Sequence, residues 1–288
     1  MSKRPELQID WAQAWIERDE ERSRPAGKEK WNKRAKGYML HSKCKSGYTA
    51  RFLEYLNLGP EPKTILDIGS GPGVLSIPLA LEGHTVYALD IAPNMLKVLH
   101  EIIERYDEPE KSLLKERIHT IEGAWESDWE ALGIPEVDIC IASRSTMVHD
   151  LNEAINKLNH YAKEKVAITV VAQASPKNDP KLYAAVGRDN GFGFDHLYYF
   201  NLLNQKGFTP EVRMICSTKN EKYQTKAEAF EKAREMLGDM TKEEQRRLKE
   251  FFDKHLIRHE EDGESYWSKD YGHEVRWAFM SWEPKSQR

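Results

Sequence analysis

Residues 64–90 read TILDIGSGPGVLSIPLALEGHTVYALD and decide the fold. Two short runs, Thr64–Ile68 and Thr85–Asp90, are rich in aliphatic and β-branched residues, which is typical of buried strands. Three closely spaced glycines follow the first run, and the apolar segment 74–81 after them predicts a helix. A strand, a helix and a second strand in this order indicate a βαβ unit with two parallel strands.

The same alternation continues beyond this unit. Helices are predicted over 93–106 and 150–161, and further strands over 118–121, 137–142 and 165–172. Strands that alternate with helices argue for a parallel sheet that is covered on both faces. We therefore expect an α/β fold: a doubly wound, mostly parallel, seven-stranded sheet with N-terminal helices and a C-terminal helical insertion.

The two ends of the chain differ from this pattern. Residues 1–58 are predicted to form a helical lead or lid, and residues 59–288 the main domain. Within 59–288, the patterns Thr225-x-x-Glu228 and Thr241-x-x-Glu244 match capping boxes that precede apolar residues at helical spacing. They predict a helix pair inserted at about 221–262, before a last strand over 275–282.

Composition and charge exclude several classes of protein. The chain has 288 residues, a net charge of −4 and three cysteines without a CxxC pair. Its longest apolar run, 166–172, is too short to span a bilayer, and its N-terminus has no apolar signal core. We expect a cytoplasmic protein with no membrane partner. Residues 22–51 carry ten Lys or Arg and one acid, which suits either an anionic partner or a solvated helix face.

The glycine loop favours a cationic nucleoside ligand over a dinucleotide. The loop reads D-x-G-x-G-x-G, whereas a GxGxxG fingerprint would place glycine at Val74. Asp67, just before the first glycine, suits a cation better than a pyrophosphate. Asp90 ends the next predicted strand, where a carboxylate can accept both hydroxyls of a ribose.

The segments ILDIGSGPG (65–73) and ALDIAPNML (88–96) resemble motifs I and II of the class I S-adenosylmethionine (AdoMet)-dependent methyltransferases. The resemblance covers about residues 30–215. It implies AdoMet as cofactor and S-adenosyl-L-homocysteine as product. It also implies that the loop wraps the methionine part of the cofactor, that Asp90 holds the ribose, and that Ile91 packs on the adenine.

Other parts of the chain match this family less closely. Many members carry an acid where Gly123 is followed by Ala124 and Trp125, which leaves Trp125 as a stacking candidate or a packed core residue. Residues 31–38 fit a W-x-x-R-A-x-x-Y lead, so Tyr38 would belong to a lid over the cofactor. The full set of expected cofactor-binding residues is Asp67, Gly69, Ser70, Gly71, Gly73, Asp90, Ile91, Met95, Ala124, Trp125, Ser143 and Tyr38.

The resemblance places the methyl acceptor beside residues 142–150, where no NPPY-like tetrapeptide is present. Arg144 could bind an acceptor carboxylate or phosphate, or form a surface salt bridge. His149 could form an acid–base pair with Asp150, although Asp150 could equally cap the next helix. His196 is the best candidate for a general base, with a structural histidine at a helix start as the alternative. These three residues, Arg144, His149 and His196, are the expected catalytic set.

Four functions compete. An enzyme that methylates a small molecule is favoured by the aromatic N-terminal lead. An RNA or protein methyltransferase would use the basic residues 22–51, but no RNA-binding module is recognisable, so nucleic acid is not the favoured partner. A non-catalytic AdoMet-binding protein is the third option, and an NAD-dependent oxidoreductase is disfavoured by Val74. No metal is expected, because His255 and His259, four apart on a predicted helix, lack the glutamate of HExxH.

Overall fold

The computed structural model describes six stretches of the chain: residues 9–20, 27–41, 47–172, 178–189, 194–261 and 263–284. The chain divides into two compact units. The first unit is Met1–Val170, His196–Ile215 and Ala278–Arg288. The second unit is Val171–Asp195 and Cys216–Trp277. Each unit is described by itself below.

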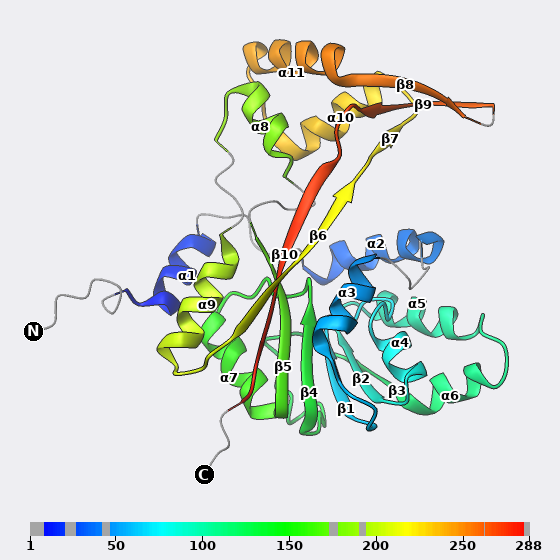
Figure 1. Ribbon diagram of the computed structural model, residues 1–288, viewed down its shortest axis with the longest axis vertical. Helices are drawn as coiled ribbons and strands as arrows, with labels where there is room; N and C mark the ends of the chain where they lie inside the picture. The colour runs from blue at the N-terminus through cyan, green and yellow to red at the C-terminus, as the bar shows by residue number, and fades with distance from the viewer. Residues whose placement is uncertain are drawn as a thin grey trace, which may run out of the picture. The chain divides into compact units, whose positions relative to one another are not determined.

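A seven-stranded sheet forms the centre of the first unit, in the order β3-β2-β1-β4-β5-β10-β6 (Figure 1). Strands β1 to β5 pair in parallel wherever they are neighbours. This confirms the mostly parallel α/β fold that the sequence predicts. The strands are β1 (Thr64–Ile68), β2 (Thr85–Asp90), β3 (Ile118–Glu122), β4 (Val137–Ser143), β5 (Ala162–Val171), β6 (Glu211–Lys219) and β10 (His273–Trp282).

The register of the strands places the functional residues at one edge. Asp67 of β1 lies opposite Ala88 of β2 and Ile141 of β4, and Ser143 of β4 lies opposite Thr169 of β5. Because all four strands run in the same direction, their carboxyl ends meet at the same edge, where ligands bind in open α/β sheets. The loops after β1, β2, β4 and β5 are therefore neighbours.

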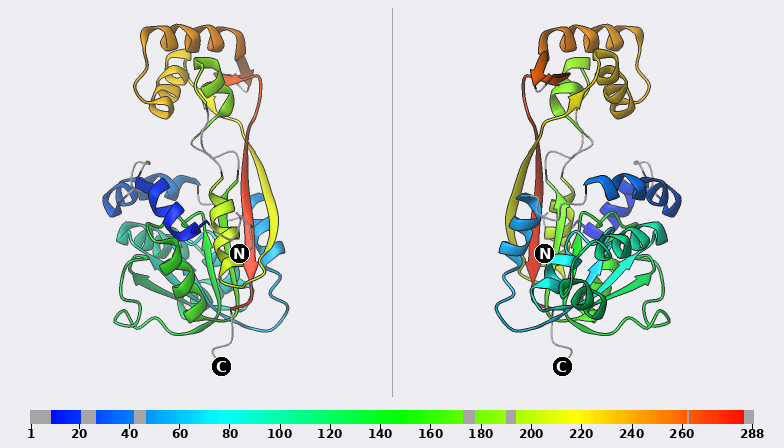
Figure 2. Two further views of the ribbon diagram at one scale, coloured as in Figure 1. Left: turned by 90° about the vertical axis from the view of Figure 1, so that its left-hand side faces the viewer. Right: turned by 90° about the vertical axis from the view of Figure 1, so that its right-hand side faces the viewer.

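Helices lie on both faces of this sheet (Figure 2). Their apolar sides are buried; Phe52 of α3, for example, packs edge-on against Phe279 of β10 at 5.2 Å between ring centroids. The helices around the sheet are α3 (Gly47–Leu56), α4 (Ser76–Leu81), α5 (Pro93–Ile103), α6 (Glu110–Arg117), α7 (Leu151–Tyr161) and α9 (Asp195–Gln205).

Two N-terminal helices, α1 (Trp11–Glu20) and α2 (Lys28–His41), also belong to the first unit. In α1, Trp15 is buried, and its Nε1 donates to the carbonyl oxygen of Val148 at 2.9 Å. In α2, Asn32 accepts at 3.1 Å from the backbone amide of Asn94, in the first turn of α5. The helical lead thus contacts the loops at the carboxyl edge of the sheet.

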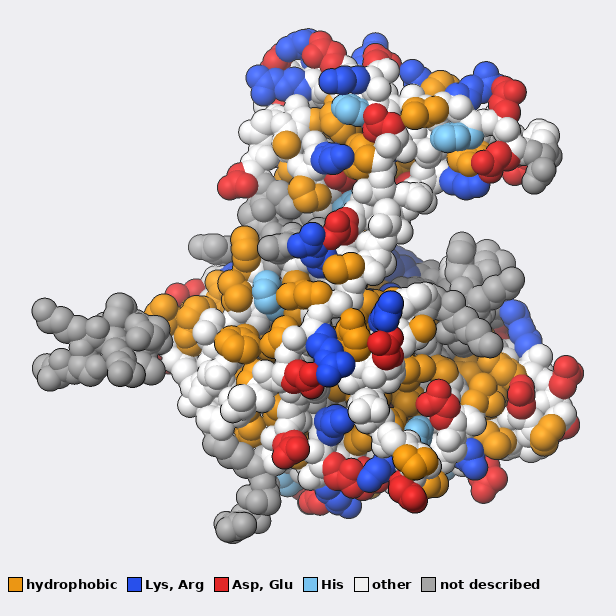
Figure 3. All heavy atoms as spheres, viewed as in Figure 1, with side chains coloured by type: hydrophobic (Ala, Val, Ile, Leu, Met, Phe, Trp, Pro, Cys, Tyr) orange, Lys and Arg blue, Asp and Glu red, His pale blue; other side chains and the backbone are white. Residues whose placement is uncertain are grey.

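The second unit has a core of its own. It contains α8 (Pro180–Val186), α10 (Lys226–Leu237), α11 (Lys242–His255) and a three-stranded sheet of β7 (Lys222–Tyr223), β9 (Glu264–Lys269) and β8 (Leu256–Glu261). Leu182, Ala233, Leu248 and Phe252 are among the buried residues of this core. The outer side of α11 carries Lys, Arg, Asp and Glu side chains intermixed, as Figure 3 shows at the top. The sequence predicted the helix pair, and Thr241 and Glu244 form the full capping box.

The prediction that His255 and His259 share one helix was wrong. Helix α11 ends at His255, and His259 lies on β8. The ring of His255 contacts Asp270 at 3.0 Å, and that of His259 contacts the hydroxyl of Ser268 at 2.9 Å. Across the described ranges, no three His, Cys, Asp or Glu side chains come together in a way that could hold a metal ion. Nor do those ranges contain a helix with the length and apolarity needed to cross a bilayer.

Candidate active site

The glycine loop after β1 is held to the end of β2 by its backbone. The amides of Gly69 and Ser70 both donate to the carbonyl oxygen of Leu89, at 2.7 and 3.0 Å. Gly69, Gly71 and Gly73 all have positive φ, of +71°, +56° and +83°. L-residues with a side chain rarely adopt this conformation, so glycine is required for the path of the loop.

The three glycines differ in what surrounds them. A Cβ at Gly69 would lie 2.3 Å from the Cβ of Ser145, and a Cβ at Gly73 would lie 2.2 Å from Leu99. A Cβ at Gly71 would meet no atom within 4 Å. Packing against the protein therefore accounts for the outer two glycines, whereas the middle one borders open space into which a ligand can fit.

Ser70 adds a hydrogen-bonding group to this loop. Its hydroxyl is buried, and no group in the described part of the chain hydrogen-bonds to it. A buried polar group without a partner costs free energy, and a bound ligand is one of the ways in which such a group is satisfied.

Asp67 lies beneath the loop as a buried carboxylate. Its Oδ2 accepts a hydrogen bond of 2.6 Å from the hydroxyl of Ser76 in α4. Burial, together with the negative charge of nearby Asp90, raises the pKa of Asp67 to about 7. A cationic ligand of the kind that the glycine loop predicts would, beside Asp67, favour the ionised carboxylate.

Asp90 links the loops after β1 and β2. Its Oδ2 accepts from the amide of Gly71, and its Oδ1 accepts from the amide of Ala92, both at 2.8 Å. Burial raises the pKa of this carboxyl. Each oxygen keeps a second acceptor position, so the carboxylate is fixed in place and can still accept the hydroxyls of a ribose.

Ala124 and Trp125, which the sequence places at the adenine side of the site, both donate hydrogen bonds within the chain. The amide of Ala124 donates to the hydroxyl of Ser127 at 2.9 Å, and Nε1 of Trp125 donates to the carbonyl oxygen of Ser145 at 2.8 Å. Trp125 thereby joins the loop after β3 to the loop after β4. Ile91 is half-buried next to Asp90, and Met95 is buried in α5.

The loop after β4 is held at nearly every residue. The amide of Arg144 donates to the hydroxyl of Thr169, and the hydroxyl of Ser145 donates to the carbonyl oxygen of Ile68 at 2.5 Å. The carbonyl oxygen of Thr146 accepts from the hydroxyl of Tyr199, in α9, at 2.6 Å. With the bond from Trp15 of α1 to Val148, hydrogen bonds to four different elements fix residues 144–148 beside the glycine loop.

Tyr48 belongs to this site, although the sequence indicates it only as part of the aromatic N-terminal lead and not as a site residue. The residue is buried in α3, and its hydroxyl contacts the hydroxyls of Ser143 at 2.8 Å and Thr169 at 2.7 Å. Burial raises the pKa of Tyr48, so its phenol stays neutral near pH 7. The sequence signal was weak: an aromatic residue at the start of a helix ordinarily indicates packing alone.

The expected catalytic residues lie on different parts of the first unit, Arg144 in the loop after β4, His149 just before α7 and His196 in α9. Asp150 caps α7, since its side chain accepts at 2.8 Å from the amide of Glu153, and His149 before it is exposed. His196 lies in the first turn of α9, three residues before Tyr199 and therefore near the same face of the helix. Tyr38 lies in α2, with its side chain outside the described residues.

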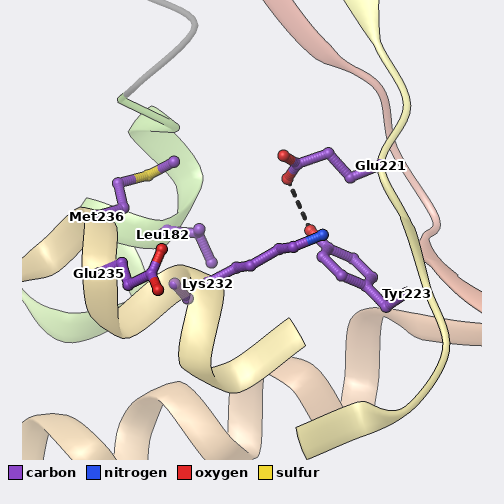
Figure 4. A pocket seen from close by; sticks show the side chains of 7 residues that line it. Leu182, Glu221, Tyr223, Lys232, Glu235 and Met236 are labelled. Atoms are coloured by element: carbon purple, nitrogen blue, oxygen red, sulfur yellow. Dashed lines mark hydrogen bonds between the residues drawn. The ribbon is translucent and has the colours of Figure 1, made fainter. Parts of the chain in front are cut away.

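A pocket of about 230 Å³ lies in the second unit and is lined by residues of that unit alone (Figure 4). Leu182, Ala233 and Met236 supply its apolar wall, and the hydroxyl of Tyr223 donates to Glu221 at 2.7 Å beside it. The volume is below the range of roughly 300–1,000 Å³ that is usual for small-molecule sites.

Comparison with known proteins agrees with this site. A family model described as a methyltransferase domain matches residues 65–165. An uncharacterised protein of Haemophilus influenzae is 31% identical over 247 residues, which cover 83% of this chain and 87% of that protein. The chain belongs to the class I AdoMet-dependent methyltransferases. The matched residues contain the glycine loop, Asp90 and the loop after β4.

Two solved structures show a weaker similarity to this chain. YjhP from Escherichia coli is 16% identical with a TM-score of 0.48, over 86% of this chain and 97% of that one. Magnesium protoporphyrin IX methyltransferase from Synechocystis PCC 6803, solved with bound SAM, is 12% identical with a TM-score of 0.41, over 81% of this chain and 79% of that one.

Proposed function

We propose that this methyltransferase holds AdoMet between the glycine loop and Asp90, and methylates a small molecule beside the loop after β4. The observation that carries the proposal is the pairing of Asp90 with the amide of Gly71, next to the open space over Gly71. The orphan hydroxyl of Ser70 and the buried Asp67 add groups that suit the ribose and cationic parts of AdoMet.

The chain's own part in the reaction is to bind, orient and exclude water. When bound, AdoMet supplies a methyl group that its sulfonium already makes electrophilic. Asp90 and the loop fix the nucleoside, while the fixed residues 144–148 position the acceptor for in-line attack. Removal of water strengthens these polar contacts. A general base is required only when the acceptor is protonated, and His196 on α9 is the candidate for that role.

The N-terminal helices support a small acceptor over a macromolecule. Trp15 of α1 donates to Val148 and packs edge-on against Tyr199 at 5.4 Å, so α1 lies over the end of the acceptor loop. Lys28 of α2 pairs with Glu122 at the end of β3, and Asn32 of α2 contacts α5. Helices that cover both halves of the edge leave room for a compact substrate.

The test is calorimetric titration with AdoMet, S-adenosylhomocysteine and NAD. We expect the first two to bind and NAD not to bind. Asp90→Ala should weaken AdoMet binding by about 1–3 kcal/mol, because charge-assisted hydrogen bonds to the ribose and to the loop are lost. Asp138→Ala is the matched control. Asp138 accepts from a backbone amide and a hydroxyl, both of Thr64, but it lies at the opposite, amino-terminal edge of the same sheet. Unchanged affinity in a folded Asp90 variant would contradict the ribose assignment.

A further inference from the structure

The backbone of Arg144 has a conformation that is unusual for a residue other than glycine. Its φ is +57°, in the left-handed region that is unfavourable for an L-residue with a side chain. The strain is held by the hydrogen bond from its amide to the hydroxyl of Thr169 at 3.0 Å. Strained non-glycine residues cluster at functional sites, where surrounding contacts keep a side chain in one place.

The guanidinium of Arg144 rests on a fixed aromatic ring. It lies 4.4 Å from the centroid of Tyr48, within the range of a cation–π contact. The ring itself cannot move freely, because Tyr48 is buried and its hydroxyl is bound between Ser143 and Thr169. Arg144 is exposed, so one side of the guanidinium faces the ring and its donors remain accessible.

This fixed cation has no carboxylate partner within the described residues. Arg213 gives the contrast inside the same unit: it also lies over a tyrosine, Tyr55 at 5.2 Å, but it pairs with Glu211 at 2.5 Å. Arginine carries five donors in a rigid fork that matches carboxylate and phosphate groups. A preorganised guanidinium without an acid of its own therefore suits an anion brought by a ligand.

Its position assigns that ligand to the methyl-transfer site. The next residue, Ser145, packs its Cβ against the space that a Cβ on Gly69 would take, and its hydroxyl binds Ile68 at the end of β1. Arg144 therefore directly precedes the residue that closes the cofactor loop. We propose, resting on the methyl transfer proposed above, that Arg144 binds an acidic group of the acceptor, a carboxylate or a phosphate, so that the acceptors are small organic anions.

The experiment measures anion binding without knowledge of the acceptor. Protein saturated with S-adenosylhomocysteine is titrated into 4-fluorobenzoate or monofluorophosphate, and binding is followed by ¹⁹F line broadening, with neutral 4-fluorobenzamide as the matched probe. We expect at least one of the anions to bind and the amide not to bind. Arg144→Asn removes the charge and keeps a residue that tolerates positive φ. It should weaken anion binding by about tenfold or more, while Arg213→Asn should leave it unchanged.

Each other outcome has a separate meaning. Absence of anion binding to the wild type, or equal binding to the Arg144 variant, would overturn the proposal. If Arg144→Asn weakens AdoMet binding itself by a similar factor in calorimetry, the guanidinium binds the carboxylate of the cofactor and the acceptor assignment is wrong. Failure of the wild type to bind AdoMet would instead overturn the proposed function.

Discussion

The carboxyl edge of the sheet has two halves of opposite character. After β1 and β2, the groups that reach the edge are carboxylates, Asp67 and Asp90, with a loop of small residues. After β4 and β5, they are hydroxyls, a tyrosine and a guanidinium: Ser143, Thr169 and Arg144 over Tyr48. One half suits a cation and a ribose, and the other suits an anion. Electrostatics alone can thus direct two different ligands to adjacent positions on one fold.

The two halves also differ in how they are made rigid. The first relies on glycine, which lets the backbone fold closely around Leu89 and beneath Ser145. The second relies on side chains that bind backbone atoms of distant segments, as Trp15, Trp125 and Tyr199 do. Substitutions in the first half should therefore act through the backbone, and those in the second through loss of single hydrogen bonds.

Gly73→Ala against Gly71→Ala is the strongest test of this contrast. A methyl group at Gly73 would lie 2.2 Å from Leu99, so we expect a loss of about 3 kcal/mol or more in the free energy of unfolding. At Gly71 there is space for the methyl, and only the positive φ costs about 1–2 kcal/mol. Gly71→Ala should instead lose AdoMet affinity.

Urea denaturation and AdoMet titration of both variants check this prediction. Equal destabilisation by the two substitutions would show that the space over Gly71 is not a ligand space.

Asp67→Asn tests the acidic half through pH. The pKa of Asp67 is about 7 in the folded protein and about 4 when exposed, so between these values the folded state holds a proton that the unfolded state has lost. This contribution makes the cofactor-free protein less stable as pH rises from about 4 to about 7. The asparagine variant has no carboxyl group to titrate at this position, so its free energy of unfolding should fall less over the same pH range.

Urea denaturation of both proteins at pH 5, 6, 7 and 8 measures this difference. Parallel pH profiles for wild type and Asp67→Asn would contradict the raised pKa.

Asp150→Ala should have the smallest effect and tests whether Asp150 belongs to the acceptor half at all. Loss of the cap on α7 should cost about 1 kcal/mol of stability. Because the carboxylate of Asp150 already accepts a hydrogen bond from the amide of Glu153, AdoMet binding and methyl transfer should stay within about twofold of the wild type. A large loss of methyl transfer at unchanged stability would instead support the hypothesis that His149 and Asp150 form an acid–base pair.

The sequence predicted the acidic half much better than the other. Strand periodicity, the glycine spacing and Asp90 are local signals, and the structure brings Asp90 to the amide of Gly71 as the loop requires. Tyr48 and Thr169 are 121 positions apart in the chain, and no local sequence pattern indicates that their hydroxyls are in contact. The positive φ of Arg144 is also invisible in sequence, because glycine is the usual signal for it.

The error at His259 has a related cause. Neither Gly nor Pro lies between His255 and His259, so nothing in the sequence marks the end of α11. The helix ends there because Leu256–Glu261 pairs with Glu264–Lys269 as a hairpin. Pairing between strands overrode the local helical pattern.

The buried ion pair of the second unit limits how that unit could be transplanted. Lys269 contacts Asp179 at 2.7 Å, with both side chains almost fully buried, and the two residues come from the separate stretches Cys216–Trp277 and Val171–Asp195. A chimaera that exchanges only the segment between β6 and β10, residues 220–272, would remove Lys269 and leave Asp179 as a buried charge without this lysine, at a cost of about 3–5 kcal/mol. Recombination, in the laboratory or in evolution, has to move both stretches together or replace Asp179 at the same time.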